Sequence, residues 1–279
     1  MTQCLAAAFG EDAAREARDL LAALCDMPRH WPLTERASLT TPDLRRRAVA
    51  AAERRATGAP LQYAAGRAAF RHLTLDVDER VLIPRPETEQ LVDLVLERTQ
   101  RVRGGVVVDV GTGSGAIALA LANEGSFDLV IGTDVSRDAI DVASQNARRC
   151  AGVLRAPVEL RQGSLLGPVP ERGLRAVVSN PPYIAYDEAG SLPASVRDWE
   201  PAVALFAGNN GMAVIAALLR DAAPRLEPAG LLALEVDVRR ASTAAELAAS
   251  HGGYDGVEVL LDLTGRERFV VARRREELG

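Results

Sequence analysis

The chain has 279 residues, which is long enough for one catalytic domain and a smaller second domain. Hydrophobic residues make up 48% and charged residues 25%, as in ordinary globular proteins. No apolar run reaches the roughly 20 residues that a membrane-spanning helix needs, so no membrane association is expected. A net charge of -5 argues against a broad basic surface, so no stable nucleic-acid binding is expected either.

Cysteine and histidine are too scattered to suggest a disulfide framework or a metal site. The chain has three residues of each type, without a CxxC pair or a histidine at ligand spacing. No metal is therefore expected. The first residues lack the basic and then apolar order of a signal peptide, which predicts a cytoplasmic protein.

The first quarter of the chain is rich in Ala, Leu, Arg and Glu, with apolar residues at helical spacing. The proline-containing pairs at 27–28 and 31–32 predict the end of a first helix. The triplet at 41–43 predicts the start of another helix, and the triplet at 58–60 its end. These breakers predict a small domain of roughly three to five short helices over residues 1–72.

The next segment, residues 73–86, is expected to form a short hairpin or an extended connector. Residues 73–78 alternate apolar and polar side chains, which is typical of a strand. Residues 81–86 contain two prolines, Pro84 and Pro86, which favour extended backbone. The catalytic domain is then expected over residues 87–279.

Beyond a helix that starts near Glu87, apolar runs alternate with helical patterns. This alternation is typical of an α/β protein with a parallel sheet whose helices cover both faces. The segment 264–268 is too short for a crossover helix, so the last two strands should be antiparallel. The predicted strands are residues 106–110, 129–133, 158–161, 176–179, 231–236, 257–263 and 269–272, and the predicted helices between them include 116–123, 136–149 and 212–226.

A glycine-rich segment from Asp109 to Gly115 follows the first predicted strand and opens a helix. Glycines allow a tight turn there and let a ligand approach backbone N–H groups. Asp134, at the end of the next strand, can accept hydrogen bonds from both hydroxyls of a ribose. Asp109 is expected either to brace the loop or to contact the cofactor. The candidate cofactor-binding residues of the loop are Gly111, Thr112, Gly113, Ser114 and Gly115.

The loop and its acid do not identify the cofactor on their own. Gly111, Gly113 and Ala116 match the pattern G-x-G-x-x-G/A, and Asp134 follows at a spacing close to that of NAD-binding folds. A NAD-dependent dehydrogenase and an S-adenosylmethionine-dependent methyltransferase therefore both fit. A glycine-rich turn without any ligand is the third possibility.

The tetrapeptide Asn180-Pro181-Pro182-Tyr183 stands directly after the fourth predicted strand. Open α/β sheets bind ligands at the carboxyl ends of their strands, so this turn should face the cofactor. The two prolines restrict the backbone and hold the flanking side chains in set directions. Asn180 Oδ1 and the Pro181 carbonyl can accept the two hydrogens of a substrate –NH2 group, while Tyr183 stacks on its plane.

Such a turn suits methyl transfer to a planar amide or amine nitrogen. An amide nitrogen is a weak nucleophile because its lone pair is delocalised into the carbonyl. Two acceptors and an aromatic face can aim the nitrogen at a methyl donor, and positioning of this kind contributes strongly to rate. The same groups can stabilise positive charge that develops on the nitrogen. The tetrapeptide therefore favours S-adenosylmethionine over NAD.

Three segments together resemble the HemK-type protein-(glutamine-N5) methyltransferases. The resemblance runs from about residue 63 to residue 273 and includes a fourth, C-terminal segment. It implies a Rossmann-like class I methyltransferase fold with a seven-stranded α/β sheet whose last strand is antiparallel. It also implies methylation of the glutamine in the Gly-Gly-Gln motif of peptide chain release factors. The three segments are residues 83–89, 109–120 and 179–184, and the fourth is residues 262–268.

The resemblance also assigns roles to individual residues. It places the glutamine amide on Asn180 to Tyr183, implies a substrate-binding role for Arg85, and lets the domain over residues 1–72 help to hold the release factor. The chain departs from the family after the third strand, where Ser164 stands in place of the common acidic residue. Ser164 is expected to bond the adenine, and Leu165 to pack on its ring. After the fifth strand a familiar glycine is missing, which leaves the role of Glu235 open.

Three alternative functions stay open from the sequence. An adenine-N6 nucleic-acid methyltransferase would present the same planar –NH2 group to the Asn180 turn after flipping the base out. A dehydrogenase leaves that turn without a function. A catalytically inactive binding protein would use the same fold to hold a translation factor.

Overall fold

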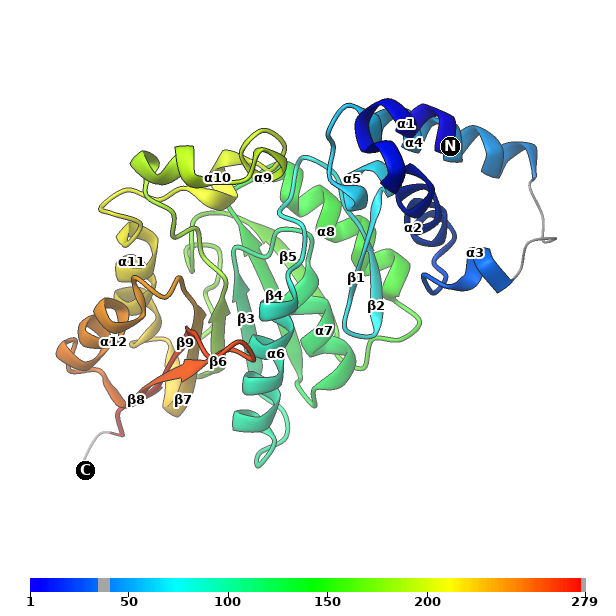
Figure 1. Cartoon of the computed structure of the whole chain (residues 1–279). Helices are drawn as coiled ribbons and strands as arrows, with labels where there is room; N and C mark the ends of the chain where they lie inside the picture. The colour runs from blue at the N-terminus through cyan, green and yellow to red at the C-terminus, as the bar shows by residue number, and fades with distance from the viewer. Residues whose placement is uncertain (35–40, 277–279) are drawn as a thin grey trace.

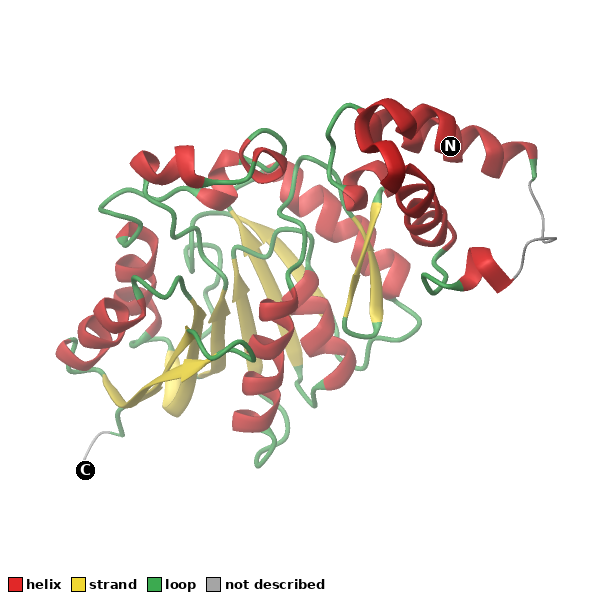
Figure 2. Cartoon of the chain, in the orientation of Figure 1, coloured by secondary structure: helices red, strands yellow, loops and turns green. Residues whose placement is uncertain are grey.

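The computed structural model describes residues 1–34 and 41–276, and Figure 1 shows the chain as a helical region beside a larger α/β body. Residues 35–40 and 277–279, which fall within the first and last predicted domains, lie outside the described residues. Helices lie on both sides of a central sheet, so the predicted α/β class is confirmed (Figure 2). Among the described residues, each helix is too short or too polar to cross a bilayer.

The N-terminal region consists of short helices around a small core of its own. Leu5, Leu20 and Leu24 are buried there against the alanines of a later helix, Ala48, Ala51 and Ala52. Trp31-Pro32 was expected to end a helix, but these residues begin one. Proline is well tolerated at the first helical positions because its missing N–H would have no partner there. The helices are α1 (Thr2–Phe9), η1 (Gly10–Asp12), α2 (Ala13–Cys25), α3 (Trp31–Thr34), α4 (Pro42–Ala56) and α5 (Leu61–Ala65).

A two-stranded antiparallel hairpin of β1 (Arg67–Phe70) and β2 (Leu73–Asp76) joins the helices to the sheet. The hairpin was expected from residue 73 onward, with helix up to about residue 71, so its first strand was placed wrongly. Gly66 ends α5 with φ +72 and redirects the chain into β1. Of the predicted range 73–86, residues 77–85 form the extended connector, since residues 73–76 belong to β2 and Pro86 begins the next helix.

The sheet has seven strands in the order β5-β4-β3-β6-β7-β9-β8, as the resemblance implied. The first five strands of this order run parallel. β9 pairs antiparallel with both β7 and β8, so the prediction for the last strands is confirmed. The strands are β3 (Val106–Val110), β4 (Leu129–Asp134), β5 (Val158–Gln162), β6 (Leu174–Ser179), β7 (Leu226–Glu235), β8 (Tyr254–Leu261) and β9 (Glu267–Arg274).

Helices cover both faces of the sheet, and successive strand residues point to opposite faces. Val107 belongs to the core on one face and Val108 to the core on the other, because strand side chains alternate. The helices on the first face are α6 (Pro86–Thr99), α7 (Ala116–Glu124) and α8 (Arg137–Cys150), and those on the second face are α11 (Ala213–Ala222) and α12 (Ala241–Ser250).

The boundary between α11 and β7 differs from the prediction. The helix was expected to reach Leu226 and the strand to begin at residue 231, but α11 ends at Ala222 and β7 already begins at Leu226. Leu226 continues the apolar helical pattern, yet it pairs with Leu174 of β6 in the sheet. Pairing with a distant strand therefore overrides the local pattern.

Short helices cover the carboxyl ends of the parallel strands. After β6 the chain forms η2 (Tyr186–Ser191), α9 (Ala194–Arg197) and α10 (Ala202–Leu205), which lie over this edge of the sheet (Figure 1). Ile184 forms an isolated parallel bridge with Phe206, which ties the start of this segment to its end. The segment closes one side of the edge where the predicted site residues meet.

Candidate functional site

The glycine loop turns sharply between β3 and α7. Gly111, Gly113 and Gly115 have φ of +74°, +53° and +85°, all in the left-handed region that glycine adopts without strain. A Cβ at Gly115 would lie 3.2 Å from the Leu119 side chain, whereas Gly111 and Gly113 face open space. The first glycines therefore leave room for a ligand, and the last allows close helix packing.

Asp134 lies at the end of β4 and is held by backbone amides. Gly113 N donates to its Oδ2 at 2.9 Å, and Ser136 N donates to its Oδ1 at 2.9 Å. Burial raises the pKa of Asp134, and these backbone hydrogen bonds oppose the rise. Each carboxylate oxygen keeps acceptor capacity toward the cavity, which suits two neighbouring hydroxyls.

Asp109 is fully buried behind the loop and braces it. Its Oδ2 accepts hydrogen bonds from Thr112 Oγ1 at 2.6 Å and from Ala118 N at 3.1 Å. Its Oδ1 is buried without a hydrogen-bond partner among the described residues. Burial raises the pKa of Asp109 to about 7, and the two hydrogen bonds oppose the rise. Of the two predicted roles, bracing is the one seen here, and contact with a cofactor stays a prediction.

A cavity of about 270 Å³ opens at the carboxyl edge of β3, β4 and β6. Four of the predicted cofactor residues, Asp109, Thr112, Ser114 and Gly115, do not line it. They shape the loop from behind: for example, the Ser114 carbonyl accepts a hydrogen bond from Asn146 Nδ2 at 2.8 Å. The other six predicted cofactor residues line the cavity, namely Gly111, Gly113, Asp134, Ser164, Leu165 and Asn180.

Leu165 and Ser164 form the wall of the cavity that follows β5. Leu165 has φ +50°, and its carbonyl accepts a hydrogen bond from Thr133 Oγ1 at 2.9 Å. This bond fixes the backbone in an otherwise unfavourable conformation. Leu165 supplies an apolar surface and Ser164 an exposed hydroxyl, a combination that fits a planar base such as adenine.

A second cavity, of about 190 Å³, lies on the other side of Asn180 and Pro181. Arg85 and Tyr183, both predicted substrate residues, line it together with apolar side chains of α9 and α10. The two cavities share Leu82, Asn180, Pro181 and Ala204 as wall residues. The predicted turn therefore stands between a cofactor-sized space and a smaller space for a substrate side chain.

Two acceptors of this turn have no hydrogen-bond donor in the part of the chain that the structure describes. Asn180 Nδ2 donates to Thr88 Oγ1 at 3.1 Å, which assigns the amide nitrogen to that side. Within residues 1–34 and 41–276, no donor bonds Asn180 Oδ1 or the Pro181 carbonyl. Both oxygens are thus free acceptors, and their predicted contact with the two hydrogens of a substrate –NH2 group stays a prediction.

Thr88 and Glu235 form a buried pair behind Asn180. Thr88 Oγ1 donates to Glu235 Oε2 at 2.8 Å, and the two residues are 5% and 2% exposed. Burial raises the pKa of Glu235 to about 7, and the Thr88 hydrogen bond and the charge of Arg268 oppose the rise. The sequence left the role of Glu235 open and missed Thr88, although Thr88 belongs to the segment 83–89 that carried the resemblance.

Arg85 is anchored by an acid that the sequence did not single out. Its Nη2 lies 2.6 Å from Oε1 and 2.8 Å from Oε2 of Glu200, whose side chain is almost fully buried. Burial raises the pKa of Glu200, and the charge of Arg85 opposes the rise. The ion pair holds the guanidinium at the second cavity, and its contact with a substrate stays a prediction.

Tyr183 presents a half-buried ring to the second cavity. Burial, together with the charge of Glu235, raises the pKa of Tyr183 to about 12. The phenol therefore stays neutral near pH 7. A neutral aromatic ring suits stacking on a planar amide, which is the predicted role.

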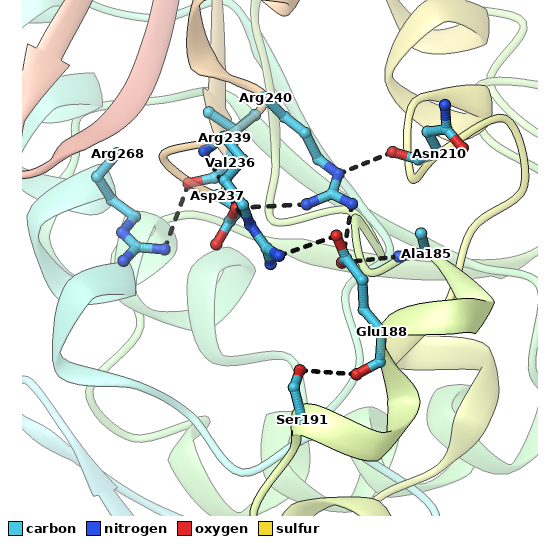
Figure 3. Close-up of polar contacts among 9 residues, drawn as sticks. All are labelled: Ala185, Glu188, Ser191, Asn210, Val236, Asp237, Arg239, Arg240 and Arg268. Atoms are coloured by element: carbon cyan, nitrogen blue, oxygen red, sulfur yellow. Dashed lines mark hydrogen bonds and ion pairs between the residues drawn. The ribbon is translucent and has the colours of Figure 1, made fainter.

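A buried arginine fastens the segment after Tyr183 to the loop after β7 (Figure 3). Arg240 Nε donates to the Asn210 carbonyl at 2.9 Å, and its Nη2 donates to Glu188 Oε2 at 2.9 Å. Glu188 Oε2 also accepts a hydrogen bond from Ala185 N at 3.2 Å. The Arg240 side chain is only 6% exposed, so the guanidinium is largely shielded from water. The contacts hold both ends of the segment that follows the Asn180 turn.

We expect Gly211→Ala to disturb this arrangement. Gly211 has φ +82°, and a Cβ there would lie 2.0 Å from the Tyr183 carbonyl oxygen and 2.4 Å from Arg240 Nε. Left-handed strain alone costs about 1–2 kcal/mol, and the Tyr183 backbone must also shift. The free energy of unfolding of the variant should be lower by at least about 2 kcal/mol, and its activity should fall. Denaturant titration measures the first quantity and methyl transfer the second.

Gly208→Ala is the matched control for this prediction. Gly208 lies in the same turn, outside the left-handed region, and a Cβ there meets nothing within 4 Å. This variant should stay within about 0.5 kcal/mol of the parent. Equal stability and activity of the two variants would contradict the expected role of Gly211.

The sequence matches known proteins along nearly its whole length. It fits the family model of the Methyltransferase small domain over residues 87–192 and that of the PrmC N-terminal domain over residues 1–66. It is 42% identical to the release factor glutamine methyltransferase of Moorella thermoacetica, over 98% of this chain and 95% of that protein. The chain belongs to the release factor glutamine methyltransferase family. The family member of Deinococcus radiodurans is also 42% identical, over 84% of this chain and 81% of its own length.

A solved structure supports the fold independently of close sequence similarity. A methyltransferase from Pyrococcus furiosus superposes with a TM-score of 0.55 at 20% identity, over 75% of this chain and 92% of that one. Membership of a methyltransferase family also decides between the two cofactor classes that the glycine loop left open. The dehydrogenase alternative is not supported, because the Asn180 turn and the family agree on methyl transfer.

Proposed function

We propose that the protein transfers a methyl group from S-adenosylmethionine to the side-chain amide N5 of the glutamine in the Gly-Gly-Gln motif of peptide chain release factors. One observation supports this most strongly: the free acceptors of Asn180 and Pro181 stand in the wall that two cavities share. One space accommodates the methyl donor and the other a glutamine side chain. Membership of the family supplies the class of substrate.

The larger cavity suits the cofactor residue by residue. Asp134 would accept from the ribose hydroxyls, Leu165 would pack on the adenine, and Ser164 would bond its edge. Gly111 and Gly113 let the ligand approach the loop because no side chain fills that space. When bound, S-adenosylmethionine would supply an electrophilic methyl group, with the thioether S-adenosylhomocysteine as the leaving group. The glutamine nitrogen would gain the methyl group and lose one proton.

The Asn180 turn orients the glutamine amide. Asn180 Oδ1 and the Pro181 carbonyl would each accept one hydrogen of the –NH2 group, and the Tyr183 ring would cover its plane. Holding the weak nucleophile in a single orientation lowers the activation barrier, because the entropy cost of orienting it is met when the substrate binds. The two oxygens also stabilise positive charge on the nitrogen, so its proton can leave to water without a strong base.

The N-terminal helices would add contacts to the rest of the release factor. A groove lined by residues of α2 and the hairpin shares Arg85 with the second cavity, and its charged side chains include Asp19, Asp26 and Arg67. Such a groove suits a polypeptide substrate. An adenine amine would fit the same two acceptors, but the net charge of -5 does not favour nucleic acid.

Transfer of labelled methyl from S-adenosylmethionine to purified release factor tests the proposed function. Label should appear on the Gly-Gly-Gln glutamine, located by mass spectrometry of the peptide. A release factor with that glutamine replaced by alanine should take up no label. Label on DNA or RNA and none on the release factor would overturn the proposal.

A further inference from the structure

We propose that Thr88 and Glu235 are positioning residues that hold the Asn180 amide with its oxygen toward the substrate. The inference rests on the proposed function, because it concerns how the glutamine amide is received. Its observation is the hydrogen-bonded series from Asn180 Nδ2 to Thr88 Oγ1 at 3.1 Å and from Thr88 Oγ1 to Glu235 Oε2 at 2.8 Å.

The orientation of an asparagine amide matters because its two ends have almost the same shape. A half-turn about the Cβ–Cγ bond exchanges the acceptor Oδ1 for the donor Nδ2. With Nδ2 in front, Asn180 would meet the substrate –NH2 group donor to donor. The turn would then repel the substrate nitrogen that it has to orient. A neighbouring group must therefore fix the Asn180 amide with Oδ1 toward the substrate.

Thr88 makes this selection because its hydroxyl has only one hydrogen. An ionised carboxylate only accepts hydrogen bonds, so the Thr88 hydrogen must point to Glu235. The oxygen of Thr88 is then left as an acceptor, and only the Nδ2 side of Asn180 can satisfy it. Thr88 and Glu235 are 5% and 2% exposed, so water does not replace either partner.

The fold brings the three residues together from distant parts of the chain. β6 and β7 are neighbours in the sheet, with Ser179 opposite Leu234, so Asn180 and Glu235 follow side by side. Thr88 comes from the first turn of α6, where its N–H donates to the Arg85 carbonyl at 3.1 Å. A rigid strand pair and a helix start therefore fix the series.

A buried carboxylate is costly, and the one hydrogen bond that Glu235 accepts from the described residues, from Thr88, offsets this cost only in part. Burial disfavours the ionised form of Glu235 most strongly, and the charge of Glu87 adds to this effect. The Thr88 hydrogen bond and the charges of Arg268 and Arg85 favour the ionised form, but the pKa of Glu235 is still raised to about 7. Burying a charge without a full set of partners lowers stability. Its place directly behind the substrate turn is explained if its acceptor oxygens direct the Thr88 hydrogen.

The test compares Thr88→Val, Thr88→Ser and a control in methyl transfer at about pH 8.5, where Glu235 is ionised. Valine keeps the shape of threonine and removes the hydroxyl, while serine keeps the hydroxyl. Thr99→Val is the control: Thr99 lies in the same helix, is 6% exposed, and its hydroxyl donates to the Val95 carbonyl at 2.6 Å. We expect Thr88→Val to lower kcat about tenfold, the value of one lost hydrogen bond.

Two further measurements separate positioning from a structural effect. Thr88→Ser should stay within about threefold of the parent, and affinity for S-adenosylmethionine, measured by calorimetry, should change less than about twofold in every variant. In protein labelled with 15N-asparagine, hydrogen exchange of the Asn180 side-chain NH2 should speed up about tenfold in Thr88→Val and not in Thr99→Val. Exchange does not depend on turnover.

The outcomes are distinct from those that bear on the proposed function. Equal kcat for Thr88→Val and Thr99→Val, equal losses in the valine and serine variants, or unchanged exchange of the Asn180 NH2 would each overturn the inference. Absence of methyl transfer by the parent protein would instead count against the function. If Thr88→Val does not fold, Glu235→Gln removes the charge that directs the hydroxyl and should also lower kcat at unchanged cofactor affinity.

Discussion

Asn180→Ala is expected to lower kcat by at least about 10²-fold while the affinity for S-adenosylmethionine changes less than about threefold. Asn180 borders both cavities, but its free oxygen is a group that the proposed substrate amide needs. Loss of one positioned group that contacts the reacting atoms typically has an effect of this size. Single-turnover methyl transfer and calorimetry with the cofactor measure the two quantities.

Gln100→Ala is the control for this variant, because Gln100 is an exposed amide at the end of α6, away from the site. It should behave as the parent in both measurements. Losses of cofactor affinity as large as those of kcat would place Asn180 in the cofactor site and remove its role toward the substrate amide.

Asp134→Ala is expected to weaken S-adenosylmethionine binding by about 10²-fold or more. Two hydrogen bonds from ribose hydroxyls to a charged acceptor contribute about 1.5–3 kcal/mol each. The same substitution releases the amides of Gly113 and Ser136, which the carboxylate now holds. Calorimetric titration gives the dissociation constant, and thermal unfolding checks that the variant is folded.

Asp138→Ala is the matched control for this second prediction. Asp138 is an exposed acid in the first turn of α8, near Asp134 in sequence but outside the cavity. Its loss should leave cofactor affinity within about twofold, because exposed charges contribute little at this distance. Equal binding by both variants would remove Asp134 from the cofactor site. Binding of NADH by the parent would revive the cofactor alternative that the glycine loop left open.

The parts of the fold that could be predicted are those coded by local pattern. The central strands β3, β4 and β6 contain apolar runs because both of their faces are covered, and Val107 and Val108 of β3 show this in the two cores, whereas the edge strand β5 alternates apolar and polar residues. The antiparallel end followed from the short connection at 264–268. The early start of β7 at Leu226 could not be predicted, because it depends on pairing with Leu174 more than 50 positions earlier.

The candidate site likewise contains residues that the sequence could identify and residues that it could not. The glycines of the loop, Asp134 and the Asn180 turn are recognisable because each needs a residue type at a fixed place after a strand. Thr88, Glu200 and Arg240 carry no such local signal. Thr88 is an ordinary first-turn residue until β7 brings Glu235 within 2.8 Å of it.

The tetrapeptide Asn180-Pro181-Pro182-Tyr183 and its distance from the glycine loop were thus determined by the sequence alone, and with them the class of chemistry. Only the tertiary structure decided which end of the Asn180 amide bonds Thr88 and which end is left as a free acceptor. The reason is physical: residue type and local backbone are set along the chain, whereas the direction of a hydrogen bond depends on partners that folding brings together. Here those partners come from α6 and β7, far from Asn180 in sequence.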